Sequence, residues 1–474
     1  MTHAVWFRSD LRVHDNPALQ AACDGDEPLI AYYFHTPGQH RQHHVGDTKL
    51  RFILETLVAL RSDLLDLNIH LVALSANDYE ASVDLLLEQC KAHQVTRVFC
   101  NQETELNERR RDRLARERLQ QAGIGFQCLR DQMVLDPTKV LTNEEEPYRV
   151  FTPFKRAWIK QARRQQLQSC GTPKRQHTIK VASTSIDEIL SWQQPTKANE
   201  HWSAGSREAQ QRLQQFLNQR AEDYDARRDL PAVDGTSQLS PYLAVGAISL
   251  RHCLLDALAA NRGEWDSGNQ GILTWISELI WREFYKYLSW HYPDLSKGKS
   301  FNPKYEDLPW NQNEKHLRAW QQGRTGYPLV DAGMRQLNTL GWMHNRLRMV
   351  TAMFLTKQLF IHWHAGEAYF MQQLIDGDYA PNNGGWQWSA STGADAAPYF
   401  RVFNPTRQSE RFDAGGDFIR HWVAELAEIS GKAIHDPSPE EREQAGYPAP
   451  IVDHRSSVEA VKQAFKQAQA TETS

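Results

Sequence analysis

The stretch from Gly341 to Pro405 mixes acidic, basic, carboxamide and indole side chains with apolar residues. Asp376 and Asp378 form a D-x-D pair, and Asn382 and Trp386 follow within a few residues. Burying such groups without hydrogen-bond partners costs several kcal/mol each. We therefore expect these side chains either to satisfy one another or to surround a large polar ligand.

A D-x-D pair alone is typical of a divalent-cation site or of ion pairs at a helix end. No further carboxylate or histidine close by completes a metal shell, so we expect no metal. Arg348 is the expected partner of Asp376, and it lies in a helical pattern of apolar residues that runs to Leu359. The Pro-Asn-Asn-Gly-Gly run at 381–385 predicts a turn.

The length of 474 residues favours two domains. No apolar run approaches the roughly 18 residues that span a bilayer, and the N-terminus lacks the pattern of a secretory signal. The six cysteines show no CxxC spacing, so we expect free thiols in a reducing compartment and no zinc site. The net charge of −4 means that any nucleic-acid site must be a local patch.

Residues 1–135 are expected to form the first domain, because short apolar runs alternate with helical patterns there. The expected strands are Ala4–Arg8, Leu29–Phe34, His70–Leu74, Arg97–Cys100 and Gly125–Leu129. The expected helices are Thr48–Leu65, Tyr79–His93 and Asn107–Gln121. This alternation predicts a doubly wound parallel sheet, whose ligands bind at the carboxyl ends of the strands.

Residues 136–205 are expected to form a long linker. Nine basic and no acidic residues lie between Pro147 and Ile186. That asymmetry is explained either by a phosphate-facing surface or by a solvated linker helix followed by a polar connector. From 206 to 474 the patterns are helical, which predicts an all-α second domain.

Several segments resemble the DNA photolyase and cryptochrome family. The densest is IDGDYAPNNGGWQWSASTGADAAPYFRVFNP, which is similar to the flavin-binding core of that family. TSQLSPYLAVGAIS, WISELIWREFYKYL and AVWFRSDLRVHDNPAL also resemble it, and the likeness covers nearly the whole chain. The resemblance is closest to bacterial class I cyclobutane pyrimidine dimer photolyases. It implies an α/β antenna domain, a linker and a helical domain that binds FAD and DNA.

The resemblance implies a set of FAD-binding residues in the second half of the chain. They are Tyr224, Thr236, Ser237, Gln238, Leu239, Ser240, Trp275, Arg282, Arg348, Asp376, Gly377, Asp378 and Asn382. Among them, the hydroxyl-rich run 236–240 would hold the pyrophosphate, although on its own it is typical of a helix N-cap. Asp378 would accept from the flavin or its ribityl arm, and Asn382 would face flavin N5.

Glu278, Trp281 and Arg282 share a helical face because they lie at i, i+3 and i+4. On their own they indicate a Glu–Arg surface pair beside a core indole. The resemblance instead implies a cavity for a flipped-out pyrimidine dimer, with catalytic roles for Glu278, Trp281, Asn345, Met349 and Asn382. The implied DNA contacts are Arg228, Glu278, Trp281, Arg282, Asn345, Arg346, Trp388, Arg401 and Gln408.

The chain holds 15 tryptophans, and most are expected to pack in cores and interfaces. Trp310, Trp363 and Trp386 match a three-indole chain that carries electrons to the flavin in the family. Asn107 and Glu108 either cap a helix or, as the resemblance implies, hold a 5,10-methenyltetrahydrofolate antenna opposite Ser296 and Lys297.

Together these features predict light-driven repair of cyclobutane pyrimidine dimers in DNA by electron transfer from reduced FAD. We expect a monomer that acts in the bacterial cytoplasm on nucleoid DNA, without a membrane or metal partner. A cryptochrome-type light sensor without repair activity and a flavoprotein electron carrier of the same fold are the alternatives. Repair activity in the light would separate them.

Overall fold

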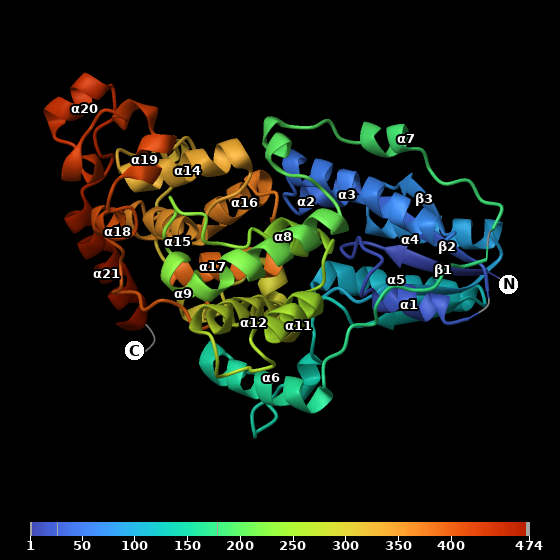
Figure 1. Cartoon of the computed structure of the whole chain (residues 1–474). Helices are drawn as coiled ribbons and strands as arrows, with labels where there is room; N and C mark the ends of the chain where they lie inside the picture. The colour runs from blue at the N-terminus through green and yellow to red at the C-terminus, as the bar shows by residue number, and fades with distance from the viewer. Residues whose placement is uncertain (1, 26, 178, 471–474) are drawn as a thin grey trace. The chain divides into compact units, whose positions relative to one another are not determined.

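The computed structural model describes residues 2–25, 27–177 and 179–470 (Figure 1). The chain forms two compact units. Unit 1 comprises Met1–Asp225, Ser237–Pro293 and Ile375–Ala380. Unit 2 comprises Ala226–Thr236, Asp294–Leu374 and Pro381–Ser474. Much of the helical segment from 206 onward is thus grouped with the sheet by its spatial contacts.

Unit 1 contains an open parallel sheet in the order β3-β2-β1-β4-β5. Its strands are β1 Thr2–Phe7, β2 Leu29–His35, β3 His70–Ser75, β4 Val95–Asn101 and β5 Gly125–Leu129. The helices around it are α1 Pro17–Cys23, α2 Pro37–Gln42, α3 Asp47–Asp66, α4 Tyr79–Ala92 and α5 Leu106–Gln121. The predicted doubly wound sheet is confirmed, with strand ends shifted by at most two residues.

The two faces of the sheet bury separate apolar cores. Val5 and Phe7 of β1 pack with residues of α1 and α3, whereas Ala4 and Trp6 pack with residues of α4 and α5. Successive side chains of a strand point to opposite faces, so both sets must be apolar when helices cover both sides. This burial explains why central strands such as β2 are continuous apolar runs.

The remaining helices of unit 1 include the expected linker helix. They are α6 Phe151–Gln165, α7 Ile186–Ser191, α8 Ser206–Gln219, α10 Ser240–Val245, α11 Leu250–Ala260 and α12 Gln270–His291. The short α9 Tyr224–Arg227 begins in unit 1 and ends in unit 2. No helix among the described residues is long and apolar enough to cross a membrane.

Unit 2 is helical around one large apolar core that includes Leu337, Leu347, Leu355 and Trp386. Its helices are α13 Glu314–Gln321, α14 Pro328–Leu340, α15 Asn345–Met353, α16 Trp363–Gln373, α18 Pro405–Phe412, α19 Asp417–Trp422, α20 Pro439–Ala445 and α21 His454–Ala470. The end of α15 continues into a π-helical turn, Phe354–Gln358.

The turn predicted at 381–385 is wrong. These residues lie inside α17, which spans Tyr379–Ala390. Pro381 is tolerated because it occupies the first turn, where a backbone N–H has no intrahelical acceptor. Each helical glycine costs about 1 kcal/mol, but Trp386 and Ala390 of the same helix are buried in the core of unit 2. Tertiary packing therefore outweighs the local turn signal.

Glu283 of α12 joins three otherwise separate segments of unit 1. Its buried carboxylate accepts from the backbone N–H of Val134 at 2.8 Å and of Leu135 at 2.9 Å, and from Trp158 Nε1 at 2.8 Å. We expect Glu283→Ala to lower the free energy of unfolding by about 3 kcal/mol, because buried donors would lose their acceptor. Urea denaturation should show this loss, with Glu117→Ala, on the exposed side of α5, as the control. Equal stability of the two variants would contradict the role of Glu283.

Candidate active site

Asp378 lies at the centre of a buried ion cluster in unit 1. Arg282 donates to one carboxylate oxygen, and Lys286 Nζ donates to the other at 2.8 Å. The two cations are four residues apart on α12, so they project from one face of that helix. Burial alone would raise the pKa of Asp378, but the charges of Lys286 and Arg282 hold it well below its usual range. Asp378 is therefore ionised at neutral pH.

Two further charged residues extend this cluster, and the sequence patterns missed both. Lys286 Nζ also donates to Glu105 Oε1 at 2.8 Å. Lys49 of α3 donates to the backbone oxygen of Gly377. Burial lowers the pKa of Lys49, partly opposed by the charge of Asp378. Only the chain fold brings these residues together, since no local motif links positions 49, 105 and 286.

Three other residues expected to bind FAD in unit 1 are Tyr224, Trp275 and Gln238. Phe216 packs against both Tyr224 and Trp275, with ring centroids 5.7 Å and 4.9 Å apart. Gln238 has a left-handed φ of 51° and accepts from Arg212 Nη1 at 3.5 Å. The N-cap of α10 is Leu239, whose side chain makes no cap hydrogen bond, so the run 236–240 is not an ordinary hydroxyl cap.

Trp281 and Glu278 lie on α12 beside the basic helix α6. The rings of Trp281 and Phe151 stack with centroids 3.6 Å apart and planes 10° apart. Lys155 of α6 lies close to Glu278: burial lowers the Lys155 pKa, and the Glu278 charge opposes that shift. Arg282 of the same helix face forms an ion pair with Asp378. Sequence spacing gave no sign of Phe151.

Asn382 and Gly385 lie on α17 in unit 2, and open space lies beside Gly385. Asn382 Nδ2 donates to the backbone oxygen of Glu367 at 3.1 Å, which fixes the carboxamide. A Cβ added at Gly385 would meet no atom within 4 Å. The two residues are three apart and therefore share a helical face. A helical glycine beside empty space fits the close approach of a planar cofactor such as a flavin.

The expected DNA-binding residues of unit 2 differ in their surroundings. Asn345 Nδ2 and Met349 Sδ are 4.0 Å apart on α15. Arg346 is paired with Asp229 at 2.7 Å, whereas Arg401 is exposed. Arg348 Nε donates to the backbone oxygen of Met343 at 2.8 Å. Arg228, Trp388 and Gln408 are half-buried in unit 2.

The three expected relay tryptophans all belong to unit 2. Trp363 and Trp386 are almost fully buried, and Trp310 is half-buried. Trp310 and Trp363 each contact the ring of His362, at 5.2 Å and 5.7 Å between centroids. Trp386 packs so closely on Gly366 of α16 that an added Cβ would lie 2.1 Å from its ring.

Trp320 is a further indole that the family pattern did not include. It is fully buried, and its ring meets that of Trp386 edge-on at 6.0 Å. Its Nε1 donates to the backbone oxygen of Thr351 at 3.0 Å. This hydrogen bond and its burial indicate a packing role, so Trp320 offers a natural comparison for Trp386.

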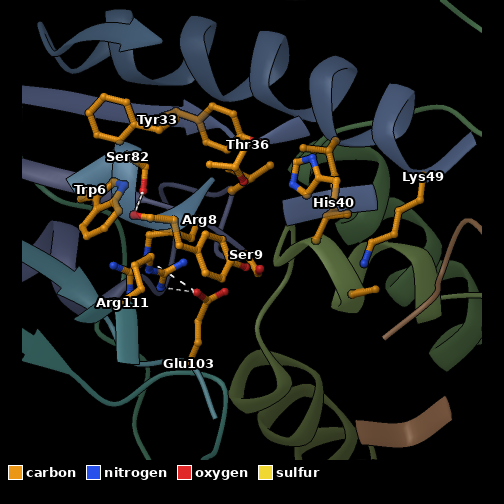
Figure 2. Close-up of a pocket in the computed structure, with 16 residues that line it drawn as sticks. Trp6, Arg8, Ser9, Tyr33, Thr36, His40, Lys49, Ser82, Glu103 and Arg111 are labelled. Carbon is orange, nitrogen blue, oxygen red and sulfur yellow. Dashed lines mark hydrogen bonds and ion pairs between the residues drawn. The ribbon is translucent and has the colours of Figure 1, made fainter. Parts of the chain in front are cut away.

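The carboxyl ends of β1, β2 and β4 surround a small polar cavity of about 70 Å³ in unit 1 (Figure 2). Arg8, Glu103 and Arg111 fill much of this edge, and Arg111 Nη2 donates to Glu103 Oε2 at 2.6 Å. Burial would raise the pKa of Glu103, but Arg111 and Arg8 lower it to about 2. The cavity has room for only a few water molecules.

Asn107 and Glu108 lie in the first turn of α5, which follows β4. Asn107 Nδ2 lies 3.0 Å from His43 Nε2, and Tyr79 donates its hydroxyl to Glu108 Oε1 at 2.8 Å. Burial and the neighbouring Glu105 raise the pKa of Glu108 to about 7. The N-cap of α5 is Glu105, so the alternative of a capping pair at 107–108 is wrong. Lys297, in unit 2, pairs with Asp294 at 2.7 Å.

Strand pairing brings together one group with metal-ligand chemistry that the sequence spacing did not indicate. Cys100 of β4 is in register with Cys128 of β5, and their sulfurs and an Asp112 oxygen lie within 4.8 Å of one another. Arg111 and Arg8 both bind Asp112, at 2.8 Å and 3.4 Å. These two positive charges oppose the binding of a cation.

Comparison with known proteins defines the class of this protein. A family model described as DNA photolyase matches residues 3–174, and one described as the FAD binding domain of DNA photolyase matches residues 275–467. The chain belongs to the DNA photolyase family. An FAD-binding domain needs space for the flavin and polar groups that contact it. The fixed carboxamide of Asn382 and the open space beside Gly385, both on α17, meet these two needs.

Individual relatives narrow the likeness further. The chain is 44% identical to the deoxyribodipyrimidine photo-lyase of Escherichia coli, over 96% of each chain. It is 45% identical to that of Salmonella typhimurium, over 98% of this chain and 99% of the other. A bacterial class III photolyase from Agrobacterium tumefaciens has a TM-score of 0.88 at 33% identity, over 99% and 98% of the two chains.

Proposed function

We propose that this protein is a deoxyribodipyrimidine photo-lyase that uses FAD and light to repair cyclobutane pyrimidine dimers in DNA. The observation that carries the proposal is the 44% identity, over 96% of both chains, to an enzyme of that name. When bound, FAD supplies the light absorption and the single electron for ring opening. The protein needs no nucleophile; its side chains bind, orient and exclude water.

In unit 1, the ionised Asp378 is proposed to accept hydrogen bonds from FAD while Arg282 and Lys286 fix its position. A carboxylate held by two cations, one on each oxygen, has little freedom to rotate, so it orients a ligand precisely. In unit 2, Asn382 is proposed to offer its carboxamide oxygen to the flavin ring. Its Nδ2 already donates to Glu367, which leaves the oxygen as the end free to accept.

For the DNA lesion, we propose that Trp281 stacks against a flipped-out base and that Glu278 hydrogen-bonds the base edge. Damaged bases are the cheapest to extrude, which contributes to selectivity. Phe151 supports Trp281 from one side, so the indole is presented as a rigid flat surface. Arg401, as an exposed cation, is proposed to contact phosphate.

We further propose that Asn107, Glu108 and Lys297 hold a methenyltetrahydrofolate antenna. The raised pKa of Glu108, about 7, suits a carboxyl that exchanges hydrogen bonds with a heterocyclic ring near neutral pH. We propose that the enzyme acts as a monomer on nucleoid DNA in the cytoplasm, with no metal.

The decisive experiment measures loss of thymine dimers from irradiated DNA, in light and in darkness, by the flavin-loaded, reduced protein. Repair should require light, and photoreduction of the flavin without repair would instead favour a light sensor.

Glu278→Ala should lower the quantum yield of repair severalfold but change DNA affinity by less than about 1 kcal/mol, because one base-edge hydrogen bond is lost. Glu117→Ala, an exposed carboxylate on α5, is the matched control. A loss confined to DNA affinity would refute the role of Glu278 in the reaction.

A further inference from the structure

Two free thiols of unit 1, Cys100 and Cys128, lie side by side and have no role in the function proposed above. They are in register on the adjacent parallel strands β4 and β5, and residues in register point to the same face of a sheet. The two sulfurs and an Asp112 oxygen all lie within 4.8 Å of one another. Adjacent strands are about 4.8 Å apart, which lies within the Cα separations that a disulfide spans. A bond between the two sulfurs is therefore compatible with the sheet.

The two thiols differ in their access to solvent. Cys100 is fully buried in the core that α4 and α5 cover, whereas Cys128 is half-buried at the margin of that core. β5 is the last strand of the sheet, so one side of it faces no further strand. A small solute can therefore reach Cys128 from the solvent, and Cys100 is within reach of the Cys128 sulfur.

Arg8 and Arg111 bring positive charge to this pair. Both bind Asp112, whose Oδ2 lies 3.9 Å from Cys128 Sγ, and Figure 2 shows both guanidinium groups beside Glu103. Arg8 Nε and Nη1 are buried and have no hydrogen-bond partner among the described residues. Nearby cations stabilise a thiolate, which is the form of cysteine that reacts with oxidants. The same charges that disfavour a metal ion thus favour ionisation of a thiol.

The pKa values of the thiols follow this arrangement. A hydrogen bond from Cys100 lowers the pKa of Cys128, and the two guanidinium charges lower it further, whereas burial and the Asp112 charge oppose them. Burial raises the pKa of Cys100 well above its usual range. Burial also raises the pKa of the half-buried Cys23 to about 12 and of the half-buried Cys170 to about 11. Cys128 is thus the half-buried thiol that ionises most readily.

We infer that Cys128 and Cys100 form a redox-active dithiol, which a hydroperoxide converts into a disulfide that fastens β5 to β4. The Cys128 thiolate attacks the hydroperoxide: an S–O bond forms, the O–O bond breaks, and the leaving oxygen takes a proton and departs as water or an alcohol. Cys100 then loses its proton and attacks the sulfenic acid sulfur of Cys128. The S–S bond forms, the S–O bond breaks and water leaves. The thiols lose two electrons, the hydroperoxide gains two, and a thiol reductant reverses the change.

The test treats the protein that carries oxidised FAD with hydrogen peroxide in the dark. Free thiols, counted with a chromogenic thiol reagent after denaturation, should fall from six to four, and dithiothreitol should restore all six. Cys128→Ser should lose its remaining thiols about tenfold more slowly, because the reactive thiolate is missing. Cys23→Ser removes another half-buried thiol and is the matched control; it should lose two thiols as fast as wild type.

Mass spectrometry of proteolytic peptides separates the two chemical steps. Wild type should give a peptide that contains Cys100 joined to Cys128. Cys100→Ala lacks the second thiol, so dimedone, a diketone that labels sulfenic acids, should label its Cys128. Hydrogen–deuterium exchange of the β5 amides should be slower in the oxidised wild type, because the edge strand is tied to its neighbour.

Four results would overturn the inference. They are six free thiols in peroxide-treated wild type, a joined peptide that contains another cysteine, equal rates for Cys128→Ser and Cys23→Ser, and unchanged exchange in β5. The joined peptide is measured in the wild type, so it tests the disulfide even where Cys100→Ala fails to fold.

Discussion

Asp378→Ala is expected to lower the free energy of unfolding by about 3–5 kcal/mol, because it removes the counter-ion of the buried Lys286 and of the half-buried Arg282. Lys286 is only 4% exposed, and among the described residues it would keep an ion pair with Glu105. Arg282 would lose its ion pair with Asp378. Urea denaturation of the FAD-free protein measures the change without any contribution from cofactor binding.

An exposed ion pair provides the matched control. Asp294 and Lys297 lie 2.7 Å apart, but their side chains are 72% and 53% exposed. Asp294→Ala should therefore lower the free energy of unfolding by less than about 1 kcal/mol. Similar losses in the two variants would mean that the Asp378 cluster is solvated rather than buried.

The same cluster predicts an acid-dependent stability. The pKa of Asp378 is depressed in the folded protein. The stabilisation that its carboxylate gives is therefore fully present at pH values above the ordinary aspartate pKa of about 3.9. It is lost as the pH falls below that value and through the folded pKa. Asp378→Ala should lack this part of the acid dependence, which denaturation curves between neutral and acidic pH would reveal.

Trp386→Phe is expected to slow photoreduction of the oxidised flavin roughly 100-fold, since a benzene ring is far harder to oxidise than an indole. Such a loss corresponds to only about 2.7 kcal/mol of added barrier. Repair by chemically reduced enzyme should stay nearly intact, because the relay that the family resemblance implies would serve photoreduction alone. Transient absorption of the flavin and dimer-loss assays measure the two activities separately.

Trp320→Phe is the control for packing. Trp320 is as deeply buried as Trp386 and touches it edge-on at 6.0 Å. Both changes leave a small void and should destabilise the protein by about 1–3 kcal/mol. Only Trp386→Phe should slow photoreduction; equal slowing by both variants would show that packing, rather than the position in the relay, matters.

The sheet could be predicted because its signal is local. Strands such as Leu29–His35 are buried along their whole length, and burial on both faces demands an uninterrupted apolar run. The helices between them carry a clear 3.6-residue period. The FAD and DNA residues, in contrast, came from family resemblance, since composition and spacing alone are also explained by a helix N-cap or a surface ion pair.

The features that the sequence did not predict depend on contacts between residues distant in sequence. Lys49 reaches Gly377, and Phe151 stacks on Trp281, without any motif that joins them. The Pro-Asn-Asn-Gly-Gly run carries a strong local turn signal, yet it is helical because buried neighbours such as Trp386 stabilise α17. Propensities summed along a few residues cannot anticipate such long-range gains.

The path of the chain has a consequence for engineering. It passes between the two units at five points, after residues 225, 236, 293, 374 and 380. No single truncation therefore liberates either unit, and a chimaera that imports one of them from a homologue must splice three separate segments. If the chain is cut between residues 226 and 380, each of the two pieces carries an incomplete portion of at least one unit. We therefore expect the two pieces to fold together when mixed, and neither piece to fold alone.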